Sequence, residues 1–170
     1  MEIIKSFKCA IKGIIYAIRN ERNMRIHTVA SFCVFLFSLF FELNSEKYIL
    51  LFFTCSFVIV CELVNSALEN LIDICAVDYN SKAKAAKDIA AGFVLLSACL
   101  AVVVGILIFK DVKGYINLWN FLCAFPWVII IVVILSVLLY CYIFMGPAEI
   151  KNKIKSKILK YFKKRRKNGK

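Results

Sequence analysis

Four polar side chains recur at helical spacing in one stretch of this otherwise apolar sequence. They are separated by three, four and four residues and are called the polar row below: Glu62, Asn65, Glu69 and Asp73. At roughly 100° per residue they fall within an arc of about 80° on one helix face. A carboxylate at the centre of a membrane helix costs on the order of 2.5–3.5 kcal/mol, and such groups usually have a partner and a function. We therefore expect the polar row to work together with other polar groups.

Three charged residues are expected at the same membrane face as the polar row. Glu21 lies among three arginines in the segment RNERNMRIH, directly before the first apolar run. Lys87 and Asp88 directly precede the third apolar run. Carboxylates of this kind suit a hard cation such as Mg²⁺, which binds one or two carboxylates together with phosphate oxygens. A lysine that neutralises a phosphoryl group and a carboxylate that takes the proton of a hydroxyl complete the parts that phosphoryl transfer needs.

The residue types by themselves leave three classes of function open. An acidic and basic face at the inner mouth of a bundle fits a phosphotransferase, the ion or proton path of a small transporter or channel, or the salt bridges of a scaffold. Neither GxxxxGK[ST] nor GxGxxG occurs, so a nucleotide must be held without either glycine loop. The single histidine, His27, leaves little for a histidine metal cluster. No two of the eight cysteines have CxxC spacing, which argues against a zinc or redox site.

The elements that hold these residues are expected to be membrane helices. Hydrophobic residues make up 62% of the 170 residues, against about 45–50% in globular proteins. Four apolar runs read as spans, at about 26–41, 48–61, 89–109 and 118–144. Because Pro126 suits a first helical turn, the fourth span is expected at residues 126–145. Residues 1–19 combine an apolar stripe with lysines and arginine, which predicts an amphipathic surface helix.

The charges predict the orientation of the chain in the membrane. Lys and Arg number six in residues 1–27, three in 62–88 and eleven in 151–170, with only three elsewhere. The positive-inside rule places both termini and the 62–88 segment in the cytoplasm of a multi-pass plasma-membrane protein, and four crossings satisfy this. Because the charge flanks spans, a nucleic-acid partner is not expected. The basic tail is expected to lie on anionic lipid, and a solvated tail is the alternative.

Three motifs resemble those of the prokaryotic diacylglycerol kinase family, which includes undecaprenol kinases. ELVNSALENLID, residues 62–73, resembles the family signature E-x-x-N-[ST]-A-[IL]-E-x-x-x-D. AKDIAAG, residues 86–92, and NERNMRIH, residues 20–27, resemble its two other motifs. The order and spacing of all three agree with the family. The resemblance implies a homotrimer of three-span subunits with N-terminal surface helices and with active sites shared between subunits.

The same resemblance implies a role for each matching residue. Glu62 is expected to act as the base for the lipid hydroxyl, and Asn65 to orient the site. Glu21 and Glu69 are expected to hold the Mg²⁺ of ATP. Lys87 and Asp88 are expected to contact the phosphates and the nucleotide, and Asp78 is expected to present a further acid to the nucleotide. The role of Asp73 is left open, and a helix-end salt bridge is the alternative for both Asp73 and Asp88.

The sequence thus predicts an all-α integral membrane protein with three parts. Residues 1–110 form the lipid kinase core, residues 111–146 add a fourth transmembrane helix, and residues 147–170 form the basic tail. The predicted activity is ATP-dependent phosphorylation of a membrane lipid, with undecaprenol favoured over diacylglycerol by the form of the first motif. A non-catalytic scaffold or a small transporter that uses the same acidic face is the alternative.

Overall fold

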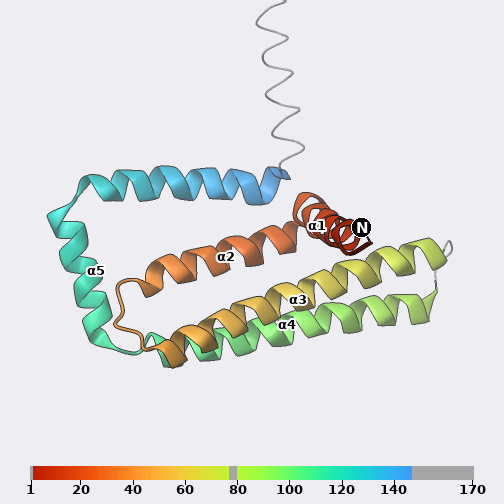
Figure 1. The fold of residues 1–170 in the computed structure, drawn as a ribbon, viewed down its shortest axis with the longest axis horizontal. Helices are drawn as coiled ribbons and strands as arrows, with labels where there is room; N and C mark the ends of the chain where they lie inside the picture. Colours follow the sequence, from red (N-terminus) through yellow and green to blue (C-terminus); the bar gives the residue numbers. More distant parts are fainter. Residues whose placement is uncertain (1, 77–79, 147–170) are drawn as a thin grey trace, which may run out of the picture.

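The computed structural model describes residues 2–76 and 80–146, and these residues are helical apart from short links. Six helices follow one another along this part of the chain (Figure 1): α1 (Glu2–Asn20), α2 (Arg22–Ser38), α3 (Ser45–Cys75), α4 (Ser81–Ile108), α5 (Val112–Ala124) and an unlabelled last helix, Trp127–Gly146. The predicted all-α class is confirmed for these residues. Asp78 and the basic tail, residues 147–170, lie outside them.

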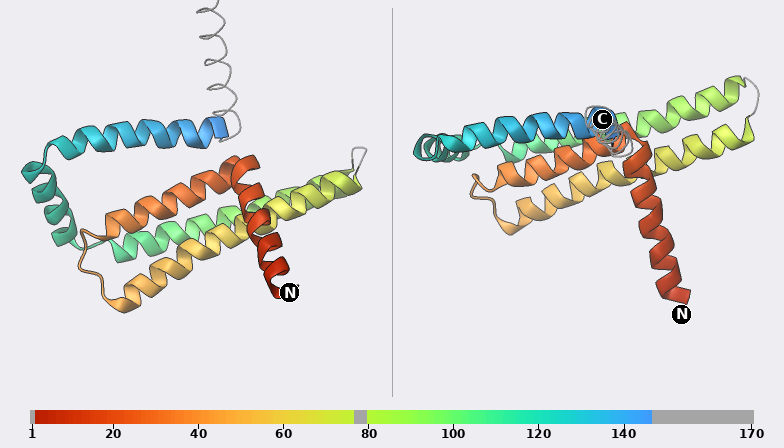
Figure 2. Two further views of the ribbon diagram at one scale, coloured as in Figure 1. Left: turned by 45° about the horizontal axis from the view of Figure 1, so that its top comes forward. Right: turned by 90° about the horizontal axis from the view of Figure 1, so that it is seen from above.

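Helix α1 runs crosswise to the longer helices (Figure 2). Ile4, Phe7 and Ile11, at three- and four-residue spacing, are exposed, as expected for a helix whose apolar face rests on a membrane surface. At Glu21 the backbone adopts extended angles, φ −95° and ψ 121°, and α2 begins at the next residue. This break turns the chain from the crosswise helix into the bundle.

Helices α3 and α4 form a long antiparallel hairpin, and α2 packs beside α3 (Figure 1). The Asn44 side chain accepts a hydrogen bond from the Lys47 amide at the start of α3, and Asn80 accepts from the Lys82 amide at the start of α4. At about 1.5 Å per residue, the 31 residues of α3 are longer than the roughly 30 Å hydrocarbon core of a bilayer. The polar row lies in the carboxyl-terminal half of this helix.

Three helices in the described part of the chain are long and apolar enough to cross a membrane: α3, α4 and Trp127–Gly146. The last of these agrees closely with the span expected at residues 126–145. The run expected to cross first, residues 26–41, lies in α2 only as far as Ser38, where this helix of 17 residues ends. A four-span arrangement and the orientation of the termini therefore remain predictions.

Aromatic rings close the end of the bundle that faces α5. Phe37, Phe41, Phe109 and Tyr115 form the aromatic cluster, with ring centroids 4.9 to 6.0 Å apart. Gly114 lies against the Phe41 ring so closely that an added Cβ would be 2.2 Å from it. Glycine is thus required at this position for α5 to approach α2.

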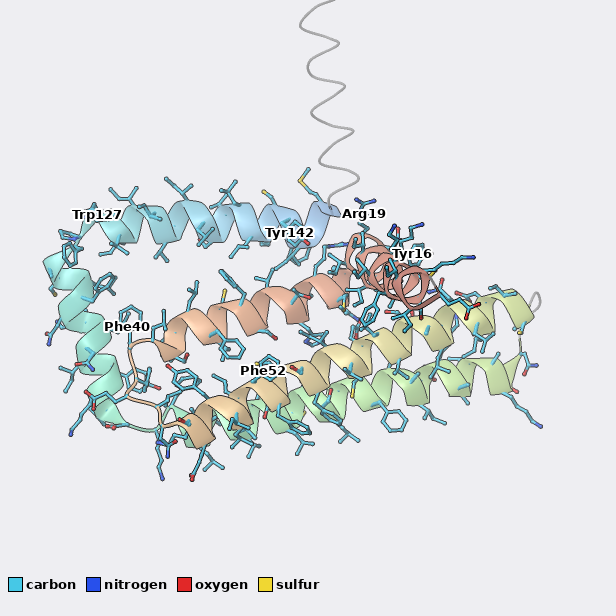
Figure 3. The ribbon with its side chains drawn as sticks, viewed as in Figure 1. Tyr16, Arg19, Phe40, Phe52, Trp127 and Tyr142 are labelled. Carbon is cyan, nitrogen blue, oxygen red and sulfur yellow. The ribbon has the colours of Figure 1, made fainter. Side chains whose placement is uncertain are left out.

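The last helix contacts the start of α2 through its carboxyl-terminal end. Arg25 is 5% exposed, and its guanidinium donates to the Ile143 carbonyl at 3.0 Å. The same guanidinium donates to the carbonyls of Ile18, at 3.3 Å, and Arg19, at 3.0 Å, in the last turn of α1. Tyr142 lies toward α1 at this end of the helix, whereas Trp127 lies at the other end, beside α5 (Figure 3).

Candidate active site

Glu62 is the centre of the candidate site. The residue is 1% exposed in the single chain, and none of the described residues donates a hydrogen bond to its Oε2 atom. Two other carboxylates, Glu21 and Glu69, lie close enough for their negative charge to act on it. A buried carboxylate oxygen without a donor is costly, so the site is suited to receive a donor from a ligand.

Glu21 reaches this centre because α1 ends and α2 begins there. The residue occupies the N-cap position of α2, but its side chain forms no capping hydrogen bond. The neighbouring residues Met24 and Arg25 are buried, which fixes the junction in place. Within one chain, Glu21 therefore lies near enough to Glu62 for its charge to act on that carboxylate.

Asn65 connects the buried and the accessible parts of the polar row. Its Nδ2 atom donates to Oε1 of Glu69 at 3.0 Å, and Glu69 is half-buried. Asn65 itself is 5% exposed, and its Oδ1 atom has no donor among the described residues. Asn65 thus holds the Glu69 carboxylate by a hydrogen bond and keeps one acceptor available.

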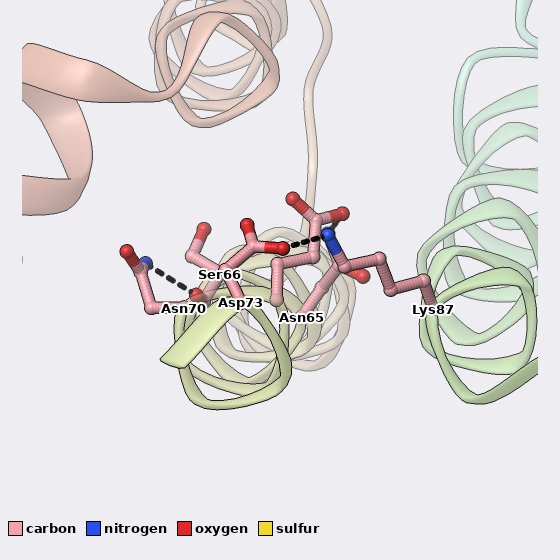
Figure 4. Close-up of polar contacts among 6 residues, drawn as sticks. Asn65, Ser66, Asn70, Asp73 and Lys87 are labelled. Carbon is pink, nitrogen blue, oxygen red and sulfur yellow. Dashed lines mark hydrogen bonds and ion pairs between the residues drawn. The ribbon is translucent and has the colours of Figure 1, made fainter. Parts of the chain in front are cut away.

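Lys87 reaches across from α4 and forms an ion pair with Asp73 of α3 (Figure 4). The pair is partly open to solvent, with 36% of the Lys87 side chain and 67% of the Asp73 side chain exposed. Of the two roles that the sequence left open for Asp73, the structure therefore shows the helix-end salt bridge. Asp88 is exposed beside Lys87.

The carboxylate oxygens of the site are suitable ligands for a magnesium ion that also binds phosphate. Within residues 2–76 and 80–146, no three His, Cys, Asp or Glu side chains form a ready metal cluster. Mg²⁺ does not need such a cluster, because it is commonly held by one or two carboxylates and substrate phosphates. The charges of Glu21 and Glu69 both act on Glu62, so these two residues fit the role of the two carboxylates.

The sequence reasoning misses one member of this face, Ser66. It is 5% exposed, and its Oγ atom has no partner among the described residues. At roughly 100° per residue it lies about 40° from Glu62, so helical spacing alone could have added it to the polar row. Ser66 also occupies the [ST] position of the signature that residues 62–73 resemble, but its burial without a partner among the described residues is what distinguishes it from other helical serines.

An apolar cavity of about 450 Å³ lies between α2, α3 and α4. Its lining includes Phe109 and Gly105 toward the aromatic cluster and His27, Val58 and Ala98 toward the polar row. Val58 is one helical turn before Glu62 on α3. The cavity therefore runs along the bundle to the neighbourhood of the buried carboxylate.

Comparison with known proteins places these features in a family. Residues 8–109 match the model described as Prokaryotic diacylglycerol kinase. A protein named Diacylglycerol kinase from Synechocystis sp. is 39% identical over 104 residues, which cover 61% of this chain and 59% of that protein. Undecaprenol kinase from Bacillus subtilis is 35% identical over 105 residues, which cover 62% of this chain and 85% of that protein. This chain thus spans less than two thirds of the first relative and most of the second.

The chain belongs to the prokaryotic diacylglycerol kinase family of lipid kinases. The residues of the candidate site, from Glu21 to Asp88, lie within the matched region. The match ends at residue 109, before α5 and the last helix.

Proposed function

We propose that this member of the family transfers the γ-phosphoryl group of ATP to the hydroxyl of a membrane lipid at the cytoplasmic interface. The observation that carries the proposal is the buried Glu62 carboxylate, whose Oε2 atom has no donor among the described residues. A lipid hydroxyl is a donor of the required kind. A carboxylate placed to accept its proton is the base that the transfer needs.

The proposed step balances as a simple displacement. The lipid oxygen forms a bond to the γ-phosphorus, the bond from that phosphorus to the β–γ bridging oxygen breaks, and the hydroxyl proton passes to Glu62. Positioning and charge neutralisation supply most of the catalysis in such reactions. Asn65 serves the first of these by holding the Glu69 carboxylate in place.

Glu21 and Glu69 would hold the magnesium ion that accompanies ATP. When bound, the ion supplies positive charge against the phosphate oxygens. Lys87 and Asp88 would contact the phosphates and the nucleotide, and the ion pair with Asp73 keeps the Lys87 ammonium beside the row. Asp78, outside the described residues, is proposed as a further contact to the nucleotide.

The proposed lipid is undecaprenol, with diacylglycerol as the second candidate. The ERNMRIH form of the first motif supports this order, and the Bacillus relative named undecaprenol kinase is covered over 85% of its length. The apolar cavity beside Val58 has room for part of a hydrocarbon chain whose hydroxyl end reaches Glu62.

The proposed assembly is a homotrimer with active sites shared between subunits in the plasma membrane. α2 would act as the first of four spans, so that both termini lie in the cytoplasm and the basic tail contacts anionic lipid. The charge distribution supports this orientation, because twenty of the 23 Lys and Arg residues lie in the three segments assigned to the cytoplasm.

One assay tests the activity. The purified full-length chain in bilayers is incubated with Mg²⁺, γ-labelled ATP and either undecaprenol or diacylglycerol, and the label in the lipid is measured. We expect label in undecaprenol, loss of label with EDTA, and recovery with added Mg²⁺. Absence of label in both lipids would overturn the kinase proposal in favour of a scaffold or transporter. Preferential labelling of diacylglycerol would reverse the proposed order of substrates.

A further inference from the structure

Ser66 differs from six other serine and threonine residues inside the described helices. Each of the six donates to a backbone carbonyl three or four residues earlier, at 2.7 to 2.8 Å: Thr28, Ser31, Ser38, Thr54, Ser97 and Ser136. This is the usual way in which a helical serine satisfies its hydroxyl. Ser66 is 5% exposed, yet its Oγ atom has no partner within residues 2–76 and 80–146.

The backbone around Ser66 does not explain the unpartnered hydroxyl. The Ser66 carbonyl accepts a hydrogen bond from Nδ2 of Asn70 at 2.7 Å, so this turn of α3 is well formed. A buried hydroxyl without a partner costs about 1–3 kcal/mol. The equally buried Ser97, 2% exposed, avoids this cost by donating to the Val94 carbonyl. A ligand that binds at Ser66 would remove the cost there.

The position of Ser66 indicates what that ligand is. Three buried side-chain atoms without partners follow one another along one turn of α3: Oε2 of Glu62, Oδ1 of Asn65 and Oγ of Ser66. Of these side chains, an ionised Glu62 can only accept, whereas the Ser66 hydroxyl can also donate. An alcohol oxygen has one hydrogen to donate and two lone pairs to share. It therefore needs both an acceptor and a donor, as Glu62 and Ser66 provide.

We propose that Ser66 is a substrate-binding residue that donates its hydroxyl hydrogen to the acceptor oxygen of the lipid alcohol. Glu62 accepts the hydrogen of the same alcohol, which leaves the second lone pair of the oxygen for attack on phosphorus. The two side chains thereby fix the orientation of the hydroxyl before transfer, which is a large part of catalysis by positioning. This inference rests on the proposed lipid kinase activity and adds a binding residue to it.

Steady-state kinetics of full-length Ser66→Ala in bilayers test the inference. Loss of one hydrogen bond to the lipid is expected to lower kcat/KM for undecaprenol about 3- to 30-fold. The KM for ATP stays within about twofold, because the nucleotide does not contact Ser66. Ser66→Thr, which keeps the hydroxyl, is expected to recover most of the lost kcat/KM. Ser97→Ala is the matched control, since it removes a buried serine hydroxyl that already has a partner, and wild-type kinetics are expected.

Three results would decide against the role of Ser66. Wild-type kcat/KM for the lipid in Ser66→Ala would exclude the hydrogen bond. A rise in the KM for ATP as large as the loss in kcat/KM for lipid would assign Ser66 to the nucleotide. Failure of Ser66→Thr to recover would assign it to packing. If Ser66→Ala does not fold, Ser66→Cys, which keeps the size but donates weakly, carries the same expectations and the same refutations. Failure of the kinase proposal itself is distinct, because the wild-type chain would then label neither lipid.

Discussion

The aromatic cluster and the polar row both contain buried side chains, but they differ in the contacts that those side chains make. Buried rings of the cluster are packed against other rings, whereas a buried carboxylate oxygen of the row has no hydrogen-bond donor among the described residues. In the aromatic cluster, Phe41 is 4% exposed and touches rings on three sides. Asn117 of the adjoining α5 donates to the Phe40 carbonyl at 3.2 Å. In the polar row, Glu62 is buried even more completely, but its Oε2 atom is left without a donor among the described residues.

This difference suggests that the aromatic cluster contributes mainly to stability and the polar row mainly to phosphoryl transfer. Apolar contacts in the cluster gain roughly 25 cal/mol per Å² of buried apolar surface. An unpartnered polar atom in the polar row costs free energy instead, and proteins tend to keep such sites where a ligand or a reaction uses them. We therefore expect substitutions in the row to affect transfer more than stability, and substitutions in the packed regions to affect stability more than transfer.

The largest expected effect is on transfer, in Glu62→Gln. Loss of a general base lowers activity by about 10²- to 10⁴-fold. The free energy of unfolding is expected not to fall, because a buried charge without a partner is removed. Labelled phosphate transfer and denaturation in detergent measure the two quantities. Glu46→Gln, at an exposed acid in the first turn of α3, is the matched control. Activity within threefold of wild type would exclude Glu62 as the base.

The next effect is on stability, in Arg25→Met at the start of α2. The change removes guanidinium hydrogen bonds to Ile143, Ile18 and Arg19, and we expect about 3 kcal/mol of lost stability and separation of the last helix from α2. The separation is measured by distances between spin labels on the two helices. Arg22→Met is the control, because the exposed Arg22 makes a cation–π contact with Phe144, worth about 0.5–1 kcal/mol, and no hydrogen bond from its side chain to the other described residues. Equal losses in the two variants would contradict the assigned role of Arg25.

A smaller loss of stability is expected in Gly114→Ala, at the aromatic cluster. The new Cβ would meet the Phe41 ring, and relieving the clash costs about 1–3 kcal/mol. Gly92→Ala is the control, because nothing lies within 4 Å of its Cβ, and it is expected to stabilise α4 by about 0.5–1 kcal/mol. Opposite shifts in melting temperature, with transfer by the folded protein unchanged in both, are the expected outcome. A stabilised Gly114→Ala would refute the close approach of α5.

The smallest effect on stability is expected at the ion pair. Because the pair is partly exposed, Asp73→Asn should change the free energy of unfolding by no more than about 1 kcal/mol, and less at high salt. Lys87→Met removes the same ion pair, so its effect on stability should be equal. Transfer should fall much further in Lys87→Met, since this lysine is proposed to contact phosphate. Equal loss of transfer in both variants would mean that Lys87 acts only through Asp73.

Much of the fold follows from local rules that can be applied to the sequence. Apolar runs and proline predict α3, α4 and the last helix, and three- and four-residue spacing predicts the face of α3 that carries Glu62. The length of α2 is predicted less well. Its apolar run continues to residue 41, but the helix ends at Ser38, where the chain turns into the aromatic cluster. A contact between distant segments decides this end, and no local pattern contains it.

The sequence by itself determined which residue types are present at helical spacing, and with them the family and the class of chemistry. Only the tertiary structure decided which of those residues are buried together. It brings Glu21 to Glu62 across the break between α1 and α2, and it pairs Lys87 with Asp73 instead of leaving the lysine free. It also leaves the Ser66 hydroxyl buried without a partner in the described chain. The physical reason is that spacing fixes the direction of a side chain on its own helix, whereas its partners depend on how separate helices pack.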